Sequence, residues 1–389
     1  MGASTIQSIL KQSFSAYEQI HPLPTYIRKA VHALIQCRTA ELGGHMQECP
    51  AKHYQRHWYN SCRHRACPQC NWLRLNEWLD RQAERLVQCG HYHMIFTLPH
   101  DLCHLWIGNV RTMTDLLFRA VRDTLFEFFM DKRHIGGKPG IIATLHTWSQ
   151  TLVLHPHIHC LITEGGFSDG QWVGRTQQGY LLPIRAVMAV FRGKYLAYLD
   201  NAVEKSELNL PDEMRGQRWK NLKNKLGRVK WNVHIQERYA YGKGVLIYLS
   251  RYIRGGPLSN GRILSNTEKG VTFRHRISGT TKQGVMTLST HDFIKRYLLH
   301  IPEPNTKVVR AYGLYAPTAK EELLLCRRHF GQSEMKAVVE PNWQSYCETK
   351  GDEHPERCPV CGLRLIRTRE IPRQACAYPP WFDAVVLAA

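Results

Sequence analysis

The chain has 389 residues, 43% of them hydrophobic, which supports two or three packed domains and excludes a largely disordered protein. Lysine and arginine outnumber aspartate and glutamate by 52 to 32, and this net charge of +20, spread along the chain, favours nucleic acid as the partner over an anionic membrane surface. No stretch approaches the roughly 20 apolar residues of a membrane-spanning helix, so we expect a cytoplasmic protein with no membrane partner.

The first elements in chain order are two amphipathic helices within residues 1–36, divided at His21-Pro22-Leu23-Pro24. Residues 37–70 are dense in cysteine and histidine and lack long apolar periodicity, so metal is expected to replace hydrophobic burial there. A helix over residues 71–86 links this segment to a short strand over residues 91–98.

A long helix comes next, and a turn at residues 136–140 introduces two strands, residues 141–152 and 157–163, that are close enough for an antiparallel hairpin. Further helices are expected at residues 184–208, 244–254 and 290–300, with a strand at 230–236 and a hairpin at 261–277. This mixture has no clean βαβ repeat. We predict an α+β fold in which helices flank a central antiparallel sheet.

The cysteine and histidine segment has the composition of a zinc-binding module. Two residues separate Cys67 from Cys70, a spacing that lets both thiolates reach one ion, and thirteen cysteines is an odd number for a disulfide framework. The histidines are the weakest candidates, because others nearby, such as His57, compete with them. Eight ligands would complete two tetrahedral zinc sites, and the candidates are Cys37, His45, Cys49, His53, Cys62, His64, Cys67 and Cys70.

A second pair, Cys358-Pro-Val-Cys361, is followed by Gly362 and has the form of a zinc knuckle. An incomplete or vestigial site is an equally good interpretation. A closed four-ligand zinc site leaves no open coordination position, so both modules are expected to organise DNA binding. Candidate partners for this second zinc region are Cys347, His354 and Cys376.

A histidine pair, His157-Ile158-His159, lies on the second strand of the expected hairpin. In a strand, alternate side chains point to opposite faces, so both imidazoles lie on one face and Ile158 on the other. The two rings can then coordinate one metal ion. Such pairs also arise by chance, as His91-Tyr92-His93 shows.

A third ligand is expected from the first strand of the hairpin. Gln150 alternates onto the same side as His146 and would supply its amide oxygen, with His146 as the rival for this role. Either residue could equally be an ordinary polar residue of a strand. An octahedral ion such as Mg²⁺ or Mn²⁺ would keep positions open for water and a phosphate oxygen.

Two tyrosines, Tyr248 and Tyr252, stand one turn apart on the helix expected at residues 244–254. Arg251 and Arg254 add positive charge suited to binding a DNA phosphodiester. The competing interpretation is that both tyrosines pack as amphipathic core residues.

Taken in order, these motifs resemble the two-tyrosine HUH transposases of rolling-circle insertion sequences, the insertion-sequence-ninety-one (IS91) family and its ISCR relatives. The resemblance covers most of the chain. Two departures concern zinc: Ala66 stands where relatives carry a histidine, and Lys52 and His53 follow Cys49 where relatives carry a second cysteine pair. The residues that carry the resemblance are residues 59–70, Phe96-Thr97-Leu98-Pro99, residues 146–152, the histidine pair and the tyrosine segment 248–252.

The resemblance implies a bacterial enzyme, associated with the nucleoid when bound to DNA, that nicks and rejoins single-stranded DNA of transposon ends and target. Tyr248 and Tyr252 would be the nucleophiles, forming a 5′-phosphotyrosine, while His157, His159 and Gln150 hold Mg²⁺ or Mn²⁺ and zinc is structural. Rejoining would need no ATP.

Three domains follow from this resemblance: a helical and zinc-binding DNA-recognition module (residues 1–90), the HUH nuclease domain (91–303) and a C-terminal region (304–389). A plasmid replication initiator or relaxase with the same chemistry is the first alternative, and a non-catalytic zinc-dependent DNA-binding protein is the second. The oligomeric state stays open.

Overall fold

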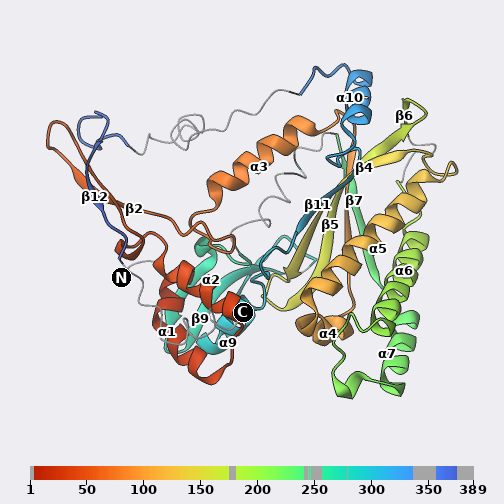
Figure 1. Cartoon of the computed structure of the whole chain (residues 1–389), viewed down its shortest axis with the longest axis horizontal. Coiled ribbons are helices and arrows are strands. Elements are labelled where there is room, and N and C mark those ends of the chain that lie inside the picture. Colours follow the sequence, from red (N-terminus) through yellow and green to blue (C-terminus); the bar gives the residue numbers. More distant parts are fainter. Residues whose placement is uncertain are drawn as a thin grey trace.

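The largest sheet of the described residues is antiparallel and has six strands, in the order β11-β4-β5-β3-β7 with β6 paired to β5 (Figure 1). The computed structural model describes residues 4–174, 181–240, 256–277, 279–335 and 356–374, together with Gly244 and Leu246. The strands of this sheet are β3 (His91–Thr97), β4 (Lys138–Trp148), β5 (Leu154–Ser168), β6 (Gln171–Val173), β7 (Asn232–Tyr239) and β11 (Val309–Gly313).

The alternation of apolar residues along the central strands explains their position in the sheet. Ile158, Cys160 and Ile162 of β5 are fully buried on one face, together with Met94 and Phe96 of β3. This face is covered by two long helices, α5 (Val110–Met130) and α6 (Ile184–Glu204), with α4 (Cys103–Gly108) and α7 (Gln217–Arg228) beside them (Figure 1). The largest hydrophobic core therefore lies between the sheet and these helices.

The described residues cover the opposite face of the sheet only in part. Two helices, α3 (Trp72–Arg85) and α10 (Lys320–His329), supply residues to a smaller core that contains Ile142 of β4 and Leu161 of β5. Figure 1 shows α3 on the side of the sheet away from α5 and α6. The histidines of β4 and β5 lie on this same face, further along the strands.

A second body joins the N-terminal helices to a segment that lies more than 200 residues later in the chain. The N-terminal helices α1 (Ile6–Ile20) and α2 (Thr25–Gln36) share one core with α9 (Thr290–Leu298) and a three-stranded sheet. That sheet has the order β10-β9-β8 and comprises β8 (Ile263–Thr267), β9 (Gly270–Arg276) and β10 (Gln283–Leu288).

A third sheet projects from this body as an arm (Figure 1). Its order is β12-β1-β2, with β1 (Gly44–Glu48) in the centre, β2 (Gln55–Tyr59) on one side and β12 (Ile366–Ile371) on the other. Both pairings are antiparallel, so a segment near the C-terminus completes a sheet that begins near the N-terminus. We refer to these three strands and their connecting turns as the arm.

The structure confirms the α+β class and the antiparallel pairing, and it corrects several boundaries. The strand expected over residues 141–152 ends at Trp148, and Ser149 to Leu152 form a turn in which Leu152 has a φ of 62°. The expected boundary at residue 303 would remove β11 from the central sheet, and the boundary at residue 90 would separate the arm from β12. None of the helices in the described ranges is both long and apolar enough to traverse a lipid bilayer.

Candidate active site and zinc-binding clusters

Three histidines converge on the partly open face of the central sheet. His157 and His159 project from β5, and His146 projects from β4 directly opposite His157 in the strand register. One ring nitrogen from each lies within 4.8 Å of the other two. We call these residues the histidine triad. Three imidazoles at this separation can ligate one metal ion.

Hydrogen bonds at the Nδ1 atoms orient both histidines of β5. The Nδ1 of His157 lies 2.6 Å from the backbone oxygen of His155, which can only accept, so this nitrogen carries the proton. The Nδ1 of His159 lies 2.7 Å from Nε2 of His93, whose own Nδ1 lies 2.9 Å from Oε1 of Gln236. Because that amide oxygen accepts, the proton of His93 is on Nδ1, and its Nε2 accepts from His159. Each β5 histidine is thus left with an unprotonated Nε2, an atom that can ligate a metal ion.

Burial keeps the triad neutral at physiological pH. The pKa of His157 is lowered to about 4, and those of His146 and His159 lie well below the ordinary value of 6.5, with desolvation as the largest cause for all three. The neighbouring imidazoles lower these pKa values further, because each disfavours a second positive charge. A neutral imidazole is the form that ligates metal.

Gln150 does not occupy the strand position that we expected. Strand β4 ends two residues earlier, so Gln150 lies in the turn, where its backbone oxygen accepts a hydrogen bond from Nη2 of Arg262 at 2.9 Å. His146, the expected rival, is the residue that lies beside His157 and His159, with its ring centroid 4.2 Å from that of His159. The alternation rule misplaced Gln150 because a register shift follows His146.

Aromatic and apolar residues flank the triad along the strands. At one end, Trp148 stacks on His146 with centroids 5.4 Å apart and lines a cavity of about 70 Å³ together with His300 and Gly256. At the other end, Leu161 is fully buried in the same cluster as Leu246.

The expected nucleophiles Tyr248 and Tyr252, and the expected DNA-binding residues Arg251 and Arg254, lie outside the described residues. Their described neighbours are Leu246, which is helical and buried in the cluster with Leu161, and Gly256, which lines the cavity beside Trp148. A Cβ on Gly256 would lie 2.8 Å from both the Ala66 oxygen and the Tyr297 hydroxyl, so only glycine fits there without a shift.

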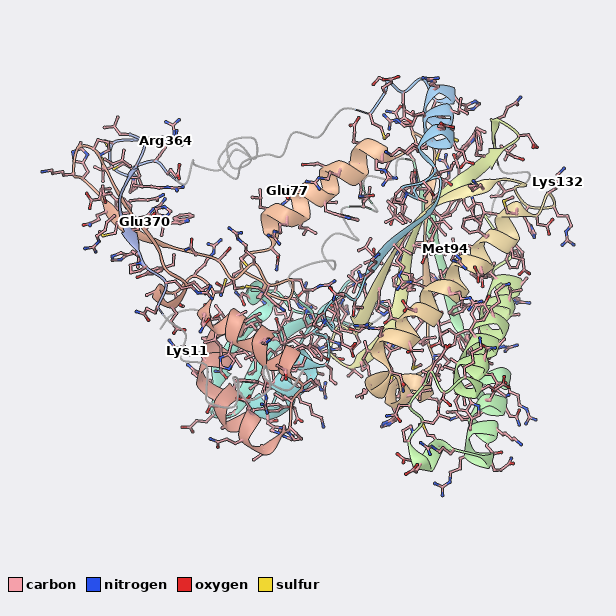
Figure 2. All side chains as sticks on the ribbon, viewed as in Figure 1. Lys11, Glu77, Met94, Lys132, Arg364 and Glu370 are labelled. Atoms are coloured by element: carbon pink, nitrogen blue, oxygen red, sulfur yellow. The ribbon has the colours of Figure 1, made fainter. Side chains whose placement is uncertain are left out.

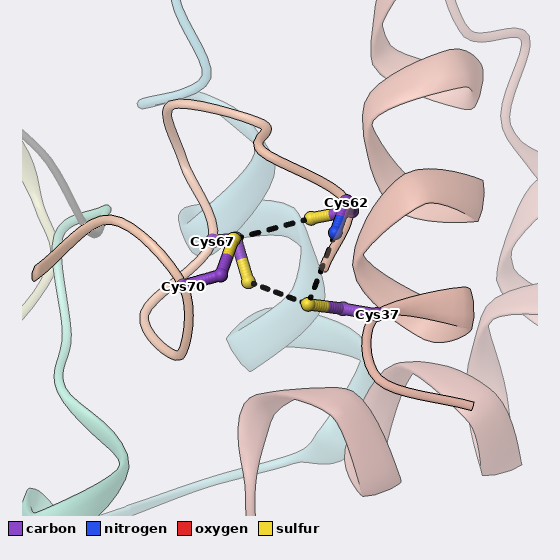
Figure 3. A group of neighbouring side chains, drawn as sticks. All are labelled: Cys37, Cys62, Cys67 and Cys70. Carbon is purple, nitrogen blue, oxygen red and sulfur yellow. Dashed lines mark hydrogen bonds between the residues drawn. The ribbon is translucent and has the colours of Figure 1, made fainter. Parts of the chain in front are cut away.

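Four cysteines of the N-terminal segment converge at the end of α2 (Figure 3). The Sγ atoms of Cys67 and Cys37 are 3.6 Å apart, as are those of Cys62 and Cys70. Thiolates held tetrahedrally around zinc at 2.3 Å are separated by about 3.8 Å, so the spacing fits that ion. The backbone N–H of Cys62 donates to Sγ of Cys37 at 3.5 Å, an interaction that stabilises a thiolate ligand.

The loop that carries three of these cysteines is held by Asn71, which is almost fully buried. Its side-chain amide donates to the backbone oxygens of His64 and Cys67, the latter at 3.0 Å. The Nδ1 of His64 accepts the N–H of Ala66 at 3.2 Å. His64 therefore shapes the loop and lies outside the four-cysteine group.

A second cluster joins distant parts of the chain. Cys49 and His53 lie with Cys358 and Cys361, and their ligand atoms all lie within 4.8 Å of one another. His45 belongs to neither cluster, and its Nε2 lies 3.1 Å from Nε2 of Gln47. The expectation that residues 37–70 hold two complete sites is therefore corrected: the segment holds one complete four-cysteine group and half of another. The expected partners Cys347, His354 and Cys376 lie outside the described residues.

Sequence reasoning missed the residues behind the triad. His93 was considered only as part of a chance His-x-His pair, and Gln236 was not singled out. Only the strand order would have pointed to them, because β3 lies between β5 and β7 and brings His93 close to residues of both strands. That order cannot be read from local patterns.

Comparison with known families matches two segments of the chain. Residues 140–322 match a family described as "Putative transposase", and residues 9–98 match a family described as "Transposase zinc-binding domain". The first range includes the histidine triad, and the second includes the four-cysteine group.

Two curated relatives are similar over nearly the whole chain. "Putative transposase y4qJ" of Sinorhizobium fredii (strain NBRC 101917 / NGR234) is 33% identical over 382 residues, 94% of this chain and 95% of the relative. "Transposase for insertion sequence element IS801" of Pseudomonas savastanoi pv. phaseolicola is 29% identical over 364 residues, 88% of this chain and 83% of the relative. No solved structure has significant similarity.

Proposed function

Because the chain belongs to the IS91 family of transposases, enzymes that act on DNA, we propose that it nicks and rejoins single-stranded DNA through a 5′-phosphotyrosine. In this proposal the histidine triad forms an HUH-type metal centre and the nucleophiles are Tyr248 and Tyr252. The observation that carries the proposal is the convergence of three neutral imidazoles on one face of the sheet, two of them oriented by hydrogen bonds.

The described neighbours of the tyrosine segment support its assignment to this centre. Leu246 packs in one cluster with Leu161 of β5 and Ile142 of β4, which lie beyond the triad at one end. Gly256 lines a cavity with Trp148, which lies beyond the triad at the other end. The nine residues that connect Leu246 to Gly256 therefore join points on either side of the triad. This is the basis for assigning Tyr248 and Tyr252, as nucleophiles, to this centre.

The three imidazoles suit a divalent cation that keeps other coordination positions open for water and a phosphate oxygen. Three imidazoles occupy at most half of an octahedral shell, and the hydrogen bonds at Nδ1 of His157 and His159 leave Nε2 of both rings unprotonated. When bound, Mn²⁺ or Mg²⁺ would polarise the scissile phosphate and orient it for in-line attack. Magnesium prefers oxygen ligands, so we expect Mn²⁺ to bind more tightly to this nitrogen-rich site.

The chemical step is a transesterification at phosphorus. A tyrosine Oη loses its proton and forms a bond to the phosphorus, and the bond from phosphorus to the 3′ oxygen of the preceding nucleotide breaks. The 3′ oxygen takes up a proton and leaves as a hydroxyl. The number of phosphoester bonds is unchanged, so the reverse reaction at a second strand rejoins DNA without ATP. A second tyrosine would let one centre hold one strand while attacking another.

Zinc has a structural role in this proposal. Cys37, Cys62, Cys67 and Cys70 complete a tetrahedral shell on their own, and Cys37 and Cys67 are also part of the core formed with α1, α2 and α9. The histidine that relatives carry at the position of Ala66 is therefore not needed as a ligand. A zinc site embedded in that core fixes the N-terminal body that is expected to contact DNA.

The decisive experiment is a covalent adduct assay with a single-stranded oligonucleotide from the element end. Wild type should form a denaturation-resistant protein–DNA adduct that depends on Mn²⁺ or Mg²⁺. Tyr248→Phe and Tyr252→Phe should each reduce strand transfer, and the double variant and His157→Ala should abolish the adduct. Matched controls are Tyr198→Phe on α6, which lies across the sheet from the triad, and the exposed His104→Ala. A full yield of adduct from the double tyrosine variant would show that Tyr248 and Tyr252 are not the nucleophiles. If the wild type only retards the oligonucleotide reversibly and forms no adduct, the protein binds DNA without cutting it.

A further inference from the structure

The arm has very little hydrophobic core of its own. Its fully buried cluster consists of Cys49, Cys358 and Leu365, with Tyr54 packed against it. Strand β12 is exposed along nearly its whole length, and among the described residues it pairs with β1 alone. Three short strands with so few buried apolar groups need another source of stability.

Two tight turns bring four metal-binding side chains together at the end of the arm. After β1, the N–H of Lys52 donates to the oxygen of Cys49 at 2.8 Å, and Lys52 has a φ of 58°, which returns the chain so that His53 lies near Cys49. In the C-terminal segment, the N–H of Gly362 donates to the oxygen of Cys358 at 2.9 Å, and Gly362 has a φ of 71°. This second turn brings the side chains of Cys358 and Cys361 together, next to Cys49 and His53.

The geometry matches zinc and excludes a disulfide. The Sγ atoms of Cys49 and Cys361 are 3.5 Å apart, close to the separation of about 3.8 Å between thiolates on one zinc ion and far beyond the length of about 2.05 Å for a sulfur–sulfur bond. Three cysteines and one histidine form a common tetrahedral set for structural zinc. Neither matched family range reaches Cys358 or Cys361.

We propose that Cys49, His53, Cys358 and Cys361 hold a second structural zinc ion, which fastens the C-terminal segment to the N-terminal hairpin and completes the arm. Each half of the chain contributes two ligands, so neither half can close the site alone. The ion substitutes for the missing core, and because the four ligands come together only in the folded arm, the free energy of zinc binding stabilises the arm directly.

The consequence of this site is a fixed position for a strongly basic strand. Residues 356–374 contain five arginines and two glutamates, and Arg367 and Arg369 lie in register with Gln47 and Met46 of β1. One of the glutamates, Glu356, pairs with Arg364 at 3.3 Å. Figure 2 shows Arg364 and Glu370 on the arm, away from the central sheet.

The test measures zinc and local protection in the full-length protein, and neither readout requires activity. Compared with wild type, Cys361→Ser and the double variant Cys358→Ser/Cys361→Ser should each lose one equivalent of zinc by elemental mass spectrometry. Hydrogen exchange in β12 should become faster, while exchange in α1, α2 and α5 stays unchanged. Cys326→Ser, which alters a buried thiol outside both clusters, and the exposed His57→Ala of the same hairpin are the controls.

Two results would overturn the proposal. Unchanged zinc content in the double cysteine variant would show that Cys358 and Cys361 are not ligands, and loss of zinc with unchanged exchange in β12 would show that the ion does not fasten the strand. If the double variant misfolds, His53→Ala decides the matter, because this side chain is exposed and its removal should still release one zinc equivalent relative to His57→Ala. These outcomes are independent of the adduct assay.

Discussion

Nε2 of His93 lies 2.7 Å from Nδ1 of His159, and this contact links the neighbouring strands β3 and β5 through their side chains. His93 is in turn bound to Gln236 of β7 at 2.9 Å, so the ring of His159 is oriented by a chain that starts two strands away. Such second-layer partners fix the tautomer of a metal-binding histidine and raise its basicity. The relay therefore determines which nitrogen of His159 faces the expected metal.

The first prediction concerns this relay. His93→Phe keeps a ring of similar size but removes the acceptor, so we expect the Mn²⁺ affinity or the adduct rate to fall by about 10- to 100-fold. Gln236→Leu should have a smaller effect in the same direction, and Gln236→Glu should preserve function because it keeps an acceptor oxygen. The measurement is the adduct rate across a Mn²⁺ titration, with the exposed His234→Ala of β7 as the control. An unaltered Mn²⁺ dependence in His93→Phe would show that the relay is only structural.

The relay also marks the limit of what local sequence patterns can predict. Period-two alternation found the faces of β5 and placed His157 and His159 together, and the proline break at residues 21–24 correctly separated α1 from α2. These features depend on neighbours within a few residues. His93 and Gln236 meet only because β3 pairs with both β5 and β7, and strand order depends on the packing of the whole sheet.

The second cysteine cluster likewise depends on contacts between distant parts of the chain, which local patterns cannot predict. The spacing of Cys358 and Cys361 signalled a metal site, but their partners Cys49 and His53 lie more than 300 positions earlier. Local spacing pointed to His45 and His64 as ligands, whereas the structure brings Cys358 and Cys361 next to Cys49 and His53. The pairing of β1 with β12 could not be predicted from alternating apolar residues, because β12 is exposed on both faces and lacks that alternation.

The second prediction separates the two candidates for the third ligand. His146→Ala should weaken metal binding strongly, because a ring nitrogen of His146 lies within 4.8 Å of one in each of the other two imidazoles, whereas Gln150→Ala in the turn should have a much smaller effect. Isothermal titration with Mn²⁺ measures both affinities directly. A larger loss in Gln150→Ala than in His146→Ala would restore the amide as the ligand and assign His146 to packing.

The third prediction concerns acid stability. Burial lowers the pKa of both His91 and His300 to about 4, whereas in the unfolded chain each titrates near 6.5. Between these values the unfolded state binds more protons, so the free energy of unfolding should fall as the pH drops from about 6.5 towards 4, by up to about 3 kcal/mol for each histidine. Above about pH 6.5 these two groups should contribute no pH dependence.

Urea unfolding at several pH values checks this expectation. His91→Gln and His300→Gln should each be less stable than wild type at neutral pH, because hydrogen bonds to Tyr315 and to the Leu152 oxygen are altered, yet each should lose less stability on acidification. Parallel pH profiles for wild type and both variants would show that these histidines already titrate normally in the folded protein.

The last prediction concerns the arm and DNA. Arg367 and Arg369 are exposed on β12, and each arginine that neutralises a phosphate releases condensed counterions. The double variant Arg367→Ala/Arg369→Ala should bind single-stranded DNA more weakly, and the slope of log affinity against log salt should become shallower by about 1.4, or roughly 0.7 per lost contact. The charge-matched control is Lys132→Ala/Arg133→Ala, which removes two exposed cations at the opposite end of the molecule, where Figure 2 labels Lys132. Equal slopes for the two double variants would mean that the arm contributes only to the general positive field of the protein, and that the arginine-rich strand touches no phosphate.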